Sequence, residues 1–240
     1  MVKALILRGP GTNCDVETGF AFSKAGADVE FIFLDALLRN PKILSRIQIL
    51  AIPGGFTYGD DLGAGTAEAA RLTKIKDEIL NFVEKGNLII GICNGFQILI
   101  KMKLLPGFKD AKATLTLIPE AKFRDEWLTL KAEPNHCVFT KGIETFRIPM
   151  ANSEGRLFIG DERTLNKIEK GGYVALRYFG KDPTNSSGKI AGLCDKTGRI
   201  LGLMPHPERN IFKHSPPDWQ DGKLGGEGLK IFKNAVDYFN

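Results

Sequence analysis

Residues 87–102 read NLIIGICNGFQILIKM, and this stretch decides the fold. Its first part, Asn87 to Ile92, is a short apolar run after Gly86 and predicts a fully buried strand. Its second part, Asn94 to Met102, is apolar nearly all round and predicts a buried helix. Cys93 is therefore placed at a sharp strand-to-helix turn, which is the arrangement of a nucleophile elbow.

An elbow of this kind projects the sulfur of Cys93 beyond the edge of the sheet, where backbone amides of the helix lie close to the sulfur. The partial positive charge at a helix N-terminus favours the thiolate, which is the nucleophilic form of cysteine. The alternative is a buried structural cysteine, the commoner role of a single cysteine. The rest of the chain favours the nucleophile.

A thiolate nucleophile needs a base, and the chain has three histidines. His206 lies in the sequence GLMPHPER, directly after a predicted strand at 199–204. Prolines on both sides stop a helix or ladder from continuing, so His206 is expected on a rigid, extended strand end. Glu208 would project to the same side and accept a proton from the second ring nitrogen. A structural histidine is the alternative, and the nearby candidate nucleophile argues against it.

Two glycine-containing turns follow predicted strands. Residues 49–56 (ILAIPGGF) form a buried strand that runs into Gly54 and Gly55, where the backbone can approach a ligand and direct amides at an oxyanion. The amide of Asn94 offers a second donor to a tetrahedral intermediate. The other turn, at 9–15 (GPGTNCD), lacks the glycine spacing of a phosphate loop, which argues against nucleotide binding there.

Four segments together resemble the class I glutamine amidotransferases: GPGTNCD, IPGGFTYGDDLGAG, GICNGFQIL and GLMPHPER. Within that family the chain is similar to the glutaminase subunits of phosphoribosylformylglycinamidine synthase, through GTNCD, GGFTYGD, the Asn-Gly-Phe-Gln run and IAGLCDKTGRILGLMPHPER. These segments extend from the first strand to the last, so the resemblance covers essentially the whole chain. It implies a flavodoxin-like α/β sandwich, in which helices cover both faces of a central, mostly parallel sheet.

The resemblance also implies a reaction. Cys93 would attack the side-chain amide of glutamine to give a glutamyl thioester and ammonia. His206 would act as general base and then as general acid, oriented by Glu208. The amides of Gly55 and Asn94 would form the oxyanion hole, and water would release glutamate.

Substrate-binding residues are implied less directly. Gln97, one helical turn from Cys93, is expected near the substrate. The family commonly carries a His-Gly-Glu-Gly run in the loop that approaches the amino-acid end of glutamine. Here residues 151–156 read ANSEGR, so Asn152 and Ser153 replace the first two positions and Glu154 is retained.

The implied partner is a large, ATP-dependent synthetase subunit that uses the ammonia, with a small third subunit in the same complex. ATP and magnesium would belong to the synthetase, because this chain has no ATP-binding loop of its own, and no cofactor is expected here. No metal is expected either, because the four cysteines have no CxxC spacing. Cys14 is interpreted as structural, lining the site at most.

Composition agrees with a soluble enzyme. The chain has 240 residues, 43% hydrophobic and 25% charged, which suits one α/β domain spanning residues 1–240. The net charge of +5 is dispersed, so nucleic-acid binding is not expected. No apolar stretch is long enough for a membrane span, and the short apolar N-terminus is not a signal peptide, which predicts a cytoplasmic protein without membrane contact.

Strand and helix patterns alternate along most of the chain, which predicts a parallel sheet. Residues 66–85 are predicted as one long helix, with Leu72, Ile75, Ile79 and Phe82 on one face. Residues 113–150 are β-rich and less regular, which predicts a smaller antiparallel extension.

Two other functions fit a cysteine at an elbow. One is a stand-alone cysteine hydrolase of the same fold, such as a peptidase or γ-glutamyl hydrolase. The other is a non-catalytic regulatory subunit that retains the fold. The acid two residues after His206 and the Asn-Gly-Phe-Gln run favour the amidotransferase, and the intact set of Cys93, His206 and Glu208 argues against a non-catalytic role.

Overall fold

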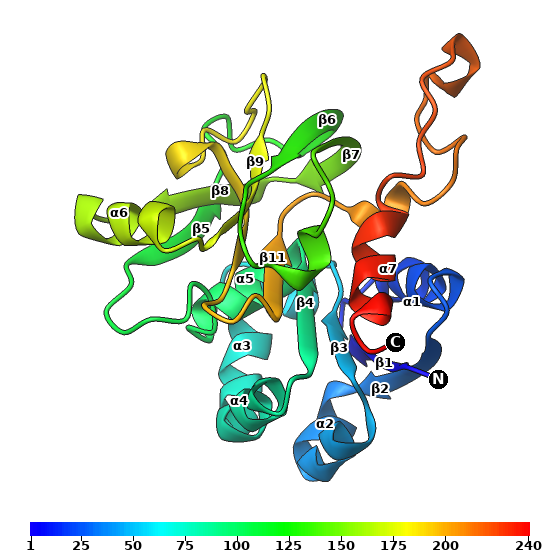
Figure 1. The fold of residues 1–240 in the computed structure, drawn as a ribbon. Helices are drawn as coiled ribbons and strands as arrows, with labels where there is room; N and C mark the ends of the chain where they lie inside the picture. The colour runs from blue at the N-terminus through cyan, green and yellow to red at the C-terminus, as the bar shows by residue number, and fades with distance from the viewer.

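The computed structural model describes residues 1–240 as alternating strands and helices (Figure 1). The strands are β1 (Lys3–Arg8), β2 (Asp28–Phe33), β3 (Ile49–Ile52), β4 (Leu88–Ile92), β5 (Ala113–Leu117), β6 (Arg124–Ala132), β7 (Thr145–Asn152), β8 (Glu154–Ile159), β9 (Val174–Tyr178), β10 (Ile190–Cys194) and β11 (Ile200–Leu203). The helices are α1 (Asp15–Lys24), α2 (Leu34–Arg39), α3 (Thr66–Leu72), α4 (Lys76–Glu84), α5 (Asn94–Lys101), α6 (Glu162–Lys170) and α7 (Leu229–Asp237). Helices α1 and α7 pack together on one flank of the parallel strands, and α3, α4 and α5 lie on the other (Figure 1).

One sheet of nine strands runs through the molecule in the order β2-β1-β3-β4-β11-β10-β9-β6-β7. The five strands from β2 to β11 pair in parallel. From β10 to β7, each strand pairs antiparallel with its neighbours, and β5 and β8 form a separate antiparallel pair. The predicted α/β sandwich with a largely parallel central sheet and an antiparallel extension is confirmed. Most of the extension continues the main sheet, whereas β5 and β8 form a separate two-stranded sheet.

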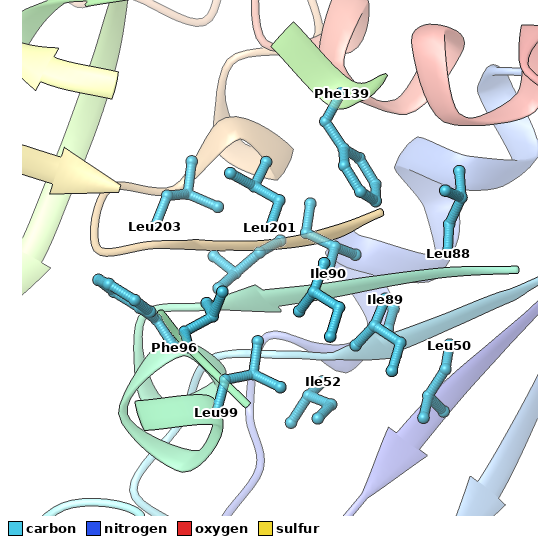
Figure 2. Close-up of a cluster of buried hydrophobic side chains, with 14 of the residues drawn as sticks. Leu50, Ile52, Leu88, Ile89, Ile90, Phe96, Leu99, Phe139, Leu201 and Leu203 are labelled. Atoms are coloured by element: carbon cyan, nitrogen blue, oxygen red, sulfur yellow. The ribbon is translucent and has the colours of Figure 1, made fainter. Parts of the chain in front are cut away.

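The central parallel strands β3, β4 and β11 are buried along their whole length. Figure 2 shows two layers of side chains, one on each face of these strands. The layer that faces α5 comprises Leu50, Ile52, Ile89, Phe96 and Leu99. The opposite layer comprises Leu88, Ile90, Phe139, Leu201 and Leu203. Burying each such side chain stabilises the fold by about 1.5–3 kcal/mol, which anchors the strands whose ends carry the candidate site.

The helices differ from prediction at one place. The prediction of a single long helix over 66–85 is wrong. Helix α3 ends at Leu72 and α4 begins at Lys76, with a 3₁₀ turn between them. The backbone leaves helical geometry at Ile75 (φ −119°, ψ 28°), and the Thr73 hydroxyl donates to the carbonyl of Ala69. Such a bond from a threonine back into its own helix bends the axis, and the bend lets α3 pack on α5 while α4 packs on β4. None of the helices has the length and apolar character needed to cross a bilayer.

The loops that carry the candidate residues follow the carboxyl ends of four neighbouring parallel strands. Gly9 follows β1, Gly54 follows β3, Cys93 follows β4 and His206 follows β11. Because parallel strands end at the same edge of a sheet, these four loops meet there. This edge is where ligands bind in open α/β sheets, and the site is built on it.

Candidate active site

Cys93 connects β4 to α5 in a backbone conformation that a side-chain-bearing residue rarely adopts, with φ 52° and ψ −106°. Two glycines permit the sharp turn. A Cβ on Gly91 would lie 2.6 Å from the Gly95 carbonyl oxygen, and one on Gly95 would lie 1.9 Å from that of Ile52. Strain of this kind costs on the order of 1–3 kcal/mol and clusters at functional sites. The strand and helix therefore cross closely enough to hold the Cys93 sulfur at the helix N-terminus.

His206 is fixed from two directions. Its backbone N–H donates to the carbonyl of Pro149 at 2.8 Å, and its Nδ1 lies 2.6 Å from Glu208 Oε1. The contact with Glu208 forms across a 3₁₀ turn at Pro207–Arg209, so the expectation of an extended segment holds only for His206 itself (φ −106°, ψ 90°). Because a carboxylate accepts, Nδ1 carries a proton and Nε2 is left as the basic nitrogen. Nε2 is buried without a hydrogen bond of good geometry.

The electrostatics favour a charged imidazole. Burial by itself lowers the pKa of His206, but the charges of Glu208 and Cys93 and the nearby thiols of Cys14 and Cys93 raise that pKa well above its usual value. A cationic ring beside the Cys93 sulfur stabilises a thiolate, so the pair is set up for nucleophilic attack.

Three reactive side chains surround Gly54. A Cβ added to this glycine would lie 3.0 Å from His206 Cε1, 3.1 Å from Cys14 Sγ and 3.4 Å from Cys93 Cβ. The fold therefore brings the side chains of residues 14, 93 and 206 together around position 54, where only glycine leaves enough space for them. Cys14 is 1% exposed and its sulfur accepts a hydrogen bond from Arg209 Nη2 at 3.1 Å.

Two backbone amides are available to an oxyanion. Gly54 O accepts from Asn13 N at 3.3 Å, and Phe56 N donates to Gly11 O at 3.0 Å. Because the direction of backbone groups alternates along an extended segment, the N–H of Gly55 points the other way and has no protein acceptor. The N–H of Asn94, at the start of α5, also has none. The expected pair of donors is thus free.

A cavity of about 280 Å³ opens beside these groups. Its walls include most of the candidate residues, namely Gly55, Cys93, Gln97, Asn152, Ser153, Glu154 and His206. Glu208 is buried behind His206, and the Asn94 side chain is buried behind the oxyanion donors. A larger hollow of about 1120 Å³, between residues 131–145 and α7, contains none of the candidate residues.

One cavity wall comes from the end of β7 and the start of β8, where the Ala151 carbonyl oxygen lies 4.0 Å from Cys93 Sγ. Asn152 is 4% exposed, and neither its Oδ1 nor its Nδ2 has a hydrogen-bond partner. Glu154 Oε2 accepts from the backbone N–H of Ala64 at 3.3 Å. Gln97 joins this turn to α5, because its Nε2 donates to Glu154 O and its Oε1 accepts from Asn94 Nδ2 at 3.0 Å. On this wall, Asn152 is therefore the residue with unused hydrogen-bonding capacity.

The chain is similar to known glutamine amidotransferases over nearly its whole length. A family model described as a CobB/CobQ-like glutamine amidotransferase domain matches residues 1–239. The phosphoribosylformylglycinamidine synthase subunit PurQ of Dehalococcoides mccartyi is 46% identical, over 99% of this chain and 97% of that protein. The PurQ subunit of Methanococcus maripaludis is 38% identical, over 99% and 97%. The chain belongs to the PurQ family of glutamine amidotransferases.

The fold of this PurQ family member is also that of a solved relative. A structure of PurLQS from Thermotoga maritima matches with a TM-score of 0.80 and 34% identity, covering 100% of this chain and 99% of that chain. The expected resemblance to glutaminase subunits of phosphoribosylformylglycinamidine synthase is confirmed, and so is glutamine amidotransferase activity.

Sequence reasoning missed several residues of the cavity in this PurQ family member. Asp60 accepts from Asn94 Nδ2 at 3.2 Å, and burial raises its pKa against the opposing hydrogen bonds from Gly65 and Asn94. Asp60 is the last residue of GGFTYGD and Arg209 is the last residue of GLMPHPER, and both line the cavity. These two residues could therefore have been named as site candidates from the motifs. Phe123 and Asp125 also line the cavity. They lie in or next to β6, far along the chain, and no local pattern marks them.

One cluster could in principle hold a metal ion. Donor atoms of Cys14, His206 and Glu208 lie within 4.8 Å of one another. However, Glu208 Oε1 already bonds His206 Nδ1, and Cys14 Sγ already accepts from Arg209. A cation would have to displace both bonds and approach a guanidinium, so the cluster suits acid–base chemistry better than a metal.

Proposed function

We propose that this chain hydrolyses glutamine through a thioester on Cys93 and supplies the ammonia to an ATP-dependent synthetase subunit of phosphoribosylformylglycinamidine synthase. The observation that carries the proposal is the meeting of Cys93 and His206 around Gly54, with Glu208 on the far ring nitrogen at 2.6 Å. Two unpaired amides, of Gly55 and Asn94, lie beside them. A nucleophile, an oriented base and an oxyanion hole are the complete set for acyl transfer.

The reaction runs in two halves. The Cys93 thiolate attacks the amide carbon of glutamine, and the N–H groups of Gly55 and Asn94 stabilise the oxyanion. His206 Nε2 gives its proton to the leaving nitrogen, so the carbon–nitrogen bond breaks and ammonia leaves. Water then loses a proton to His206 and attacks the thioester, the carbon–sulfur bond breaks, and glutamate is released, which restores the Cys93 thiolate beside the protonated His206. Glu208 stabilises the imidazolium in both halves.

The amino-acid end of glutamine lies against the β7–β8 turn in this proposal. Asn152 offers an unpaired buried amide, which is a costly arrangement unless a ligand satisfies it. Ser153 lines the cavity beside it. Glu154 and Gln97 act by holding the turn in place, because their polar groups contact Ala64, Asn94 and each other.

The partner is proposed from the relatives. The curated relatives are named as synthase subunits, and the Thermotoga maritima structure is named PurLQS. We infer a large synthetase subunit and a small third subunit, with ATP and magnesium bound by the synthetase. The chain would act as a single domain in the cytoplasm, without nucleic-acid or membrane contact.

Cys93→Ala in the assembled complex tests the proposal. Synthesis driven by glutamine should fall to background, whereas synthesis driven by added ammonia should stay within about twofold of the wild-type rate. Cys137→Ala is the matched control, because that buried cysteine lies outside the cavity. Retention of glutamine-driven synthesis by Cys93→Ala would exclude the thioester, and loss of both activities would assign Cys93 a structural role.

A further inference from the structure

The side chain of Asn94 is a fully buried amide whose nitrogen and oxygen both have side-chain partners. Its Nδ2 donates to Asp60 Oδ1 at 3.2 Å and to Gln97 Oε1 at 3.0 Å. Its Oδ1 lies 2.7 Å from Thr57 Oγ1. A buried polar network in which every member is satisfied is rigid, so each of these side chains is fixed by its neighbours. The proposed chemistry uses only the backbone N–H of Asn94, which leaves the role of its side chain to be explained.

The direction of each bond in this network follows from its last member, the backbone of Glu154. A carbonyl oxygen only accepts, so Gln97 presents its Nε2 to Glu154 O and its Oε1 to Asn94. The Asn94 amide is therefore oriented with its nitrogen toward Gln97, and the carboxylate of Asp60 is a second acceptor on the same side. Asn94 Oδ1 then faces Thr57, and the Thr57 hydroxyl donates its single proton to that oxygen.

The network joins the two segments that carry the proposed oxyanion donors. Thr57 and Asp60 lie in the loop after β3, where Gly55 also lies. Asn94 is the first residue of α5 and offers the second donor from its backbone. Helix α5 is buried from Asn94 to Ile100, so the loop is the more easily displaced of the two segments. The side chain of Asn94 therefore contacts the loop of the other donor at two points.

The loop after β3 has a backbone conformation that its own residues do not favour. Residues 58–60 all have positive φ (56°, 67° and 54°), and only the middle one is glycine. A left-handed conformation at residues with side chains persists only where the surroundings enforce it. On one side of the loop, Tyr58 N donates to Pro10 O at 2.8 Å. On the other side, the two bonds with Asn94 hold both ends of this turn.

We propose that Thr57 is a positioning residue for the oxyanion hole, because its hydroxyl bonds the Asn94 side chain and so sets the distance between the Gly55 and Asn94 N–H groups. This proposal rests on the proposed function, since it concerns the same hole. Without the hydroxyl, Asn94 Oδ1 is buried without a donor and the strained turn is released at one end, so the Gly55 amide shifts. The oxyanion forms only as the reaction proceeds, so this shift slows the reaction without weakening the binding of glutamine.

Two substitutions separate the hydroxyl of Thr57 from its volume. Thr57→Val has nearly the same volume and lacks the hydroxyl, whereas Thr57→Ser keeps the hydroxyl and lacks the methyl group. In the assembled complex, Thr57→Val should lower kcat for glutamine hydrolysis about tenfold with KM within about twofold of wild type. Thr57→Ser should keep kcat within about threefold of wild type, because the donor to Asn94 is retained. Thr140→Val, at a buried threonine outside the cavity, is the matched control and should leave both constants within about twofold.

Alkylation of Cys93 shows whether the nucleophile itself is intact in these variants. Iodoacetamide reacts with a thiolate by direct displacement of iodide, which forms no oxyanion, so the rate does not depend on the hole. Mass spectrometry of the peptide that contains Cys93 should give an alkylation rate in Thr57→Val within about twofold of wild type. Ammonia-driven synthesis by the same complexes reports whether each variant folds and assembles.

Three kinetic results would overturn the proposal. They are a kcat in Thr57→Val within twofold of wild type, a loss of kcat in Thr57→Ser as large as in Thr57→Val, and a rise in KM in place of the loss of kcat. An alkylation rate that falls as much as kcat would also overturn it, because the substitution would then act on the nucleophile. Absence of any glutaminase activity in wild type would instead refute the proposed function.

A measurement on the wild-type protein decides the question if Thr57→Val loses ammonia-driven synthesis. The probe is the glutamine analogue 6-diazo-5-oxonorleucine, which alkylates the nucleophile and leaves a carbonyl group beside it. In a crystal structure of the wild-type complex modified in this way, a retained Thr57–Asn94 bond, with the carbonyl oxygen accepting from both backbone amides, supports the positioning role. A Thr57–Asn94 bond that is broken in the modified complex overturns it.

Discussion

The parallel and antiparallel halves of the sheet contribute different parts of the site. The parallel strands β3, β4 and β11 end at Gly54, Cys93 and His206, which are the groups that make and break bonds in the proposed mechanism. The antiparallel strands contribute the turn with Asn152, the group whose hydrogen-bonding capacity is unused. In the proposed mechanism, the chemistry therefore belongs to the parallel half and substrate recognition to the antiparallel half.

The difference has a physical basis. A parallel strand covered on both faces is held by apolar packing along its length, so the residue at its end is fixed with little freedom. The β7–β8 turn is held mainly by polar contacts, such as those between Gln97 and Glu154. Such contacts are easier to exchange than apolar packing, which suits a surface that must select a substrate.

The largest expected effect comes from removing the base on the parallel half. His206→Ala should lower kcat for glutamine hydrolysis by about 10³-fold or more, because the residue acts in both halves of the reaction. Ammonia-driven synthesis in the complex should be unchanged and serves as the control. A glutaminase rate within tenfold of wild type would show that another group is the base.

A smaller effect follows from filling the point where the reactive groups meet. Gly54→Ala puts a methyl group 3.0 Å from His206 Cε1 and 3.1 Å from Cys14 Sγ, so these neighbours must shift by a few tenths of an ångström, which moves His206 relative to Cys93. Displacement of reacting groups by about 1 Å costs on the order of 10²-fold in rate, and we expect kcat to fall by up to that factor. Thermal melting should show a folded protein. Unchanged kcat would mean that the groups can move apart without loss of function.

Substitution on the antiparallel half should change binding instead of chemistry. Asn152→Ala should raise KM for glutamine roughly tenfold with kcat within about threefold, because it removes hydrogen bonds made equally in the ground and transition states. Steady-state kinetics of the assembled complex measure both constants. Asn81→Ala, on the exposed face of α4, is the control. A fall in kcat at constant KM would place Asn152 in the chemistry and weaken the division between the halves.

The same two halves explain how much could be predicted from the sequence. The elbow at Cys93 is predictable because apolar runs on both sides encode β4 and α5 locally. His206 and Glu208 are predictable from the flanking prolines and their spacing of two residues, and the motif resemblance implies the same roles. Asp125 was not predictable, because β6 lines the cavity only through pairing with β7 and β9, which no local pattern encodes. The break between α3 and α4 was missed for a different reason. Leu72, Ile75, Ile79 and Phe82 keep a helical spacing across it, and only tertiary packing shows that the two segments face different elements.

Glu68 shows the limit most clearly. A single acid in a helix pattern ordinarily indicates an exposed face, and nothing within α3 marks this residue as buried. In the folded chain this residue is 1% exposed, and its carboxyl packs against Gly9 in the turn that follows β1. Polar networks that join distant loops are determined by the assembled fold, so they have to be found in the structure.

The smallest expected effect concerns the periphery of the antiparallel half. Arg147 on β7 forms a bidentate pair with Asp218, at 2.9 and 3.1 Å, and so attaches the loop that precedes α7. The hydrogen bonds from Arg147, together with that from Lys223, hold the pKa of Asp218 at about 2, below its usual 3.8. Because the folded-state pKa is lowered, this stabilisation is present above about pH 4 and is lost as the pH falls toward 2.

Asp218→Asn should lower Tm by roughly 1–2 °C at pH 7, as expected for a partly exposed ion pair, and the difference from wild type should shrink at pH 3. Melting curves at the two pH values test this, and kcat should be unchanged in both because the pair lies outside the cavity. A loss of kcat in Asp218→Asn would show that this loop communicates with the site, and the separation of the two halves would then fail at its outer edge.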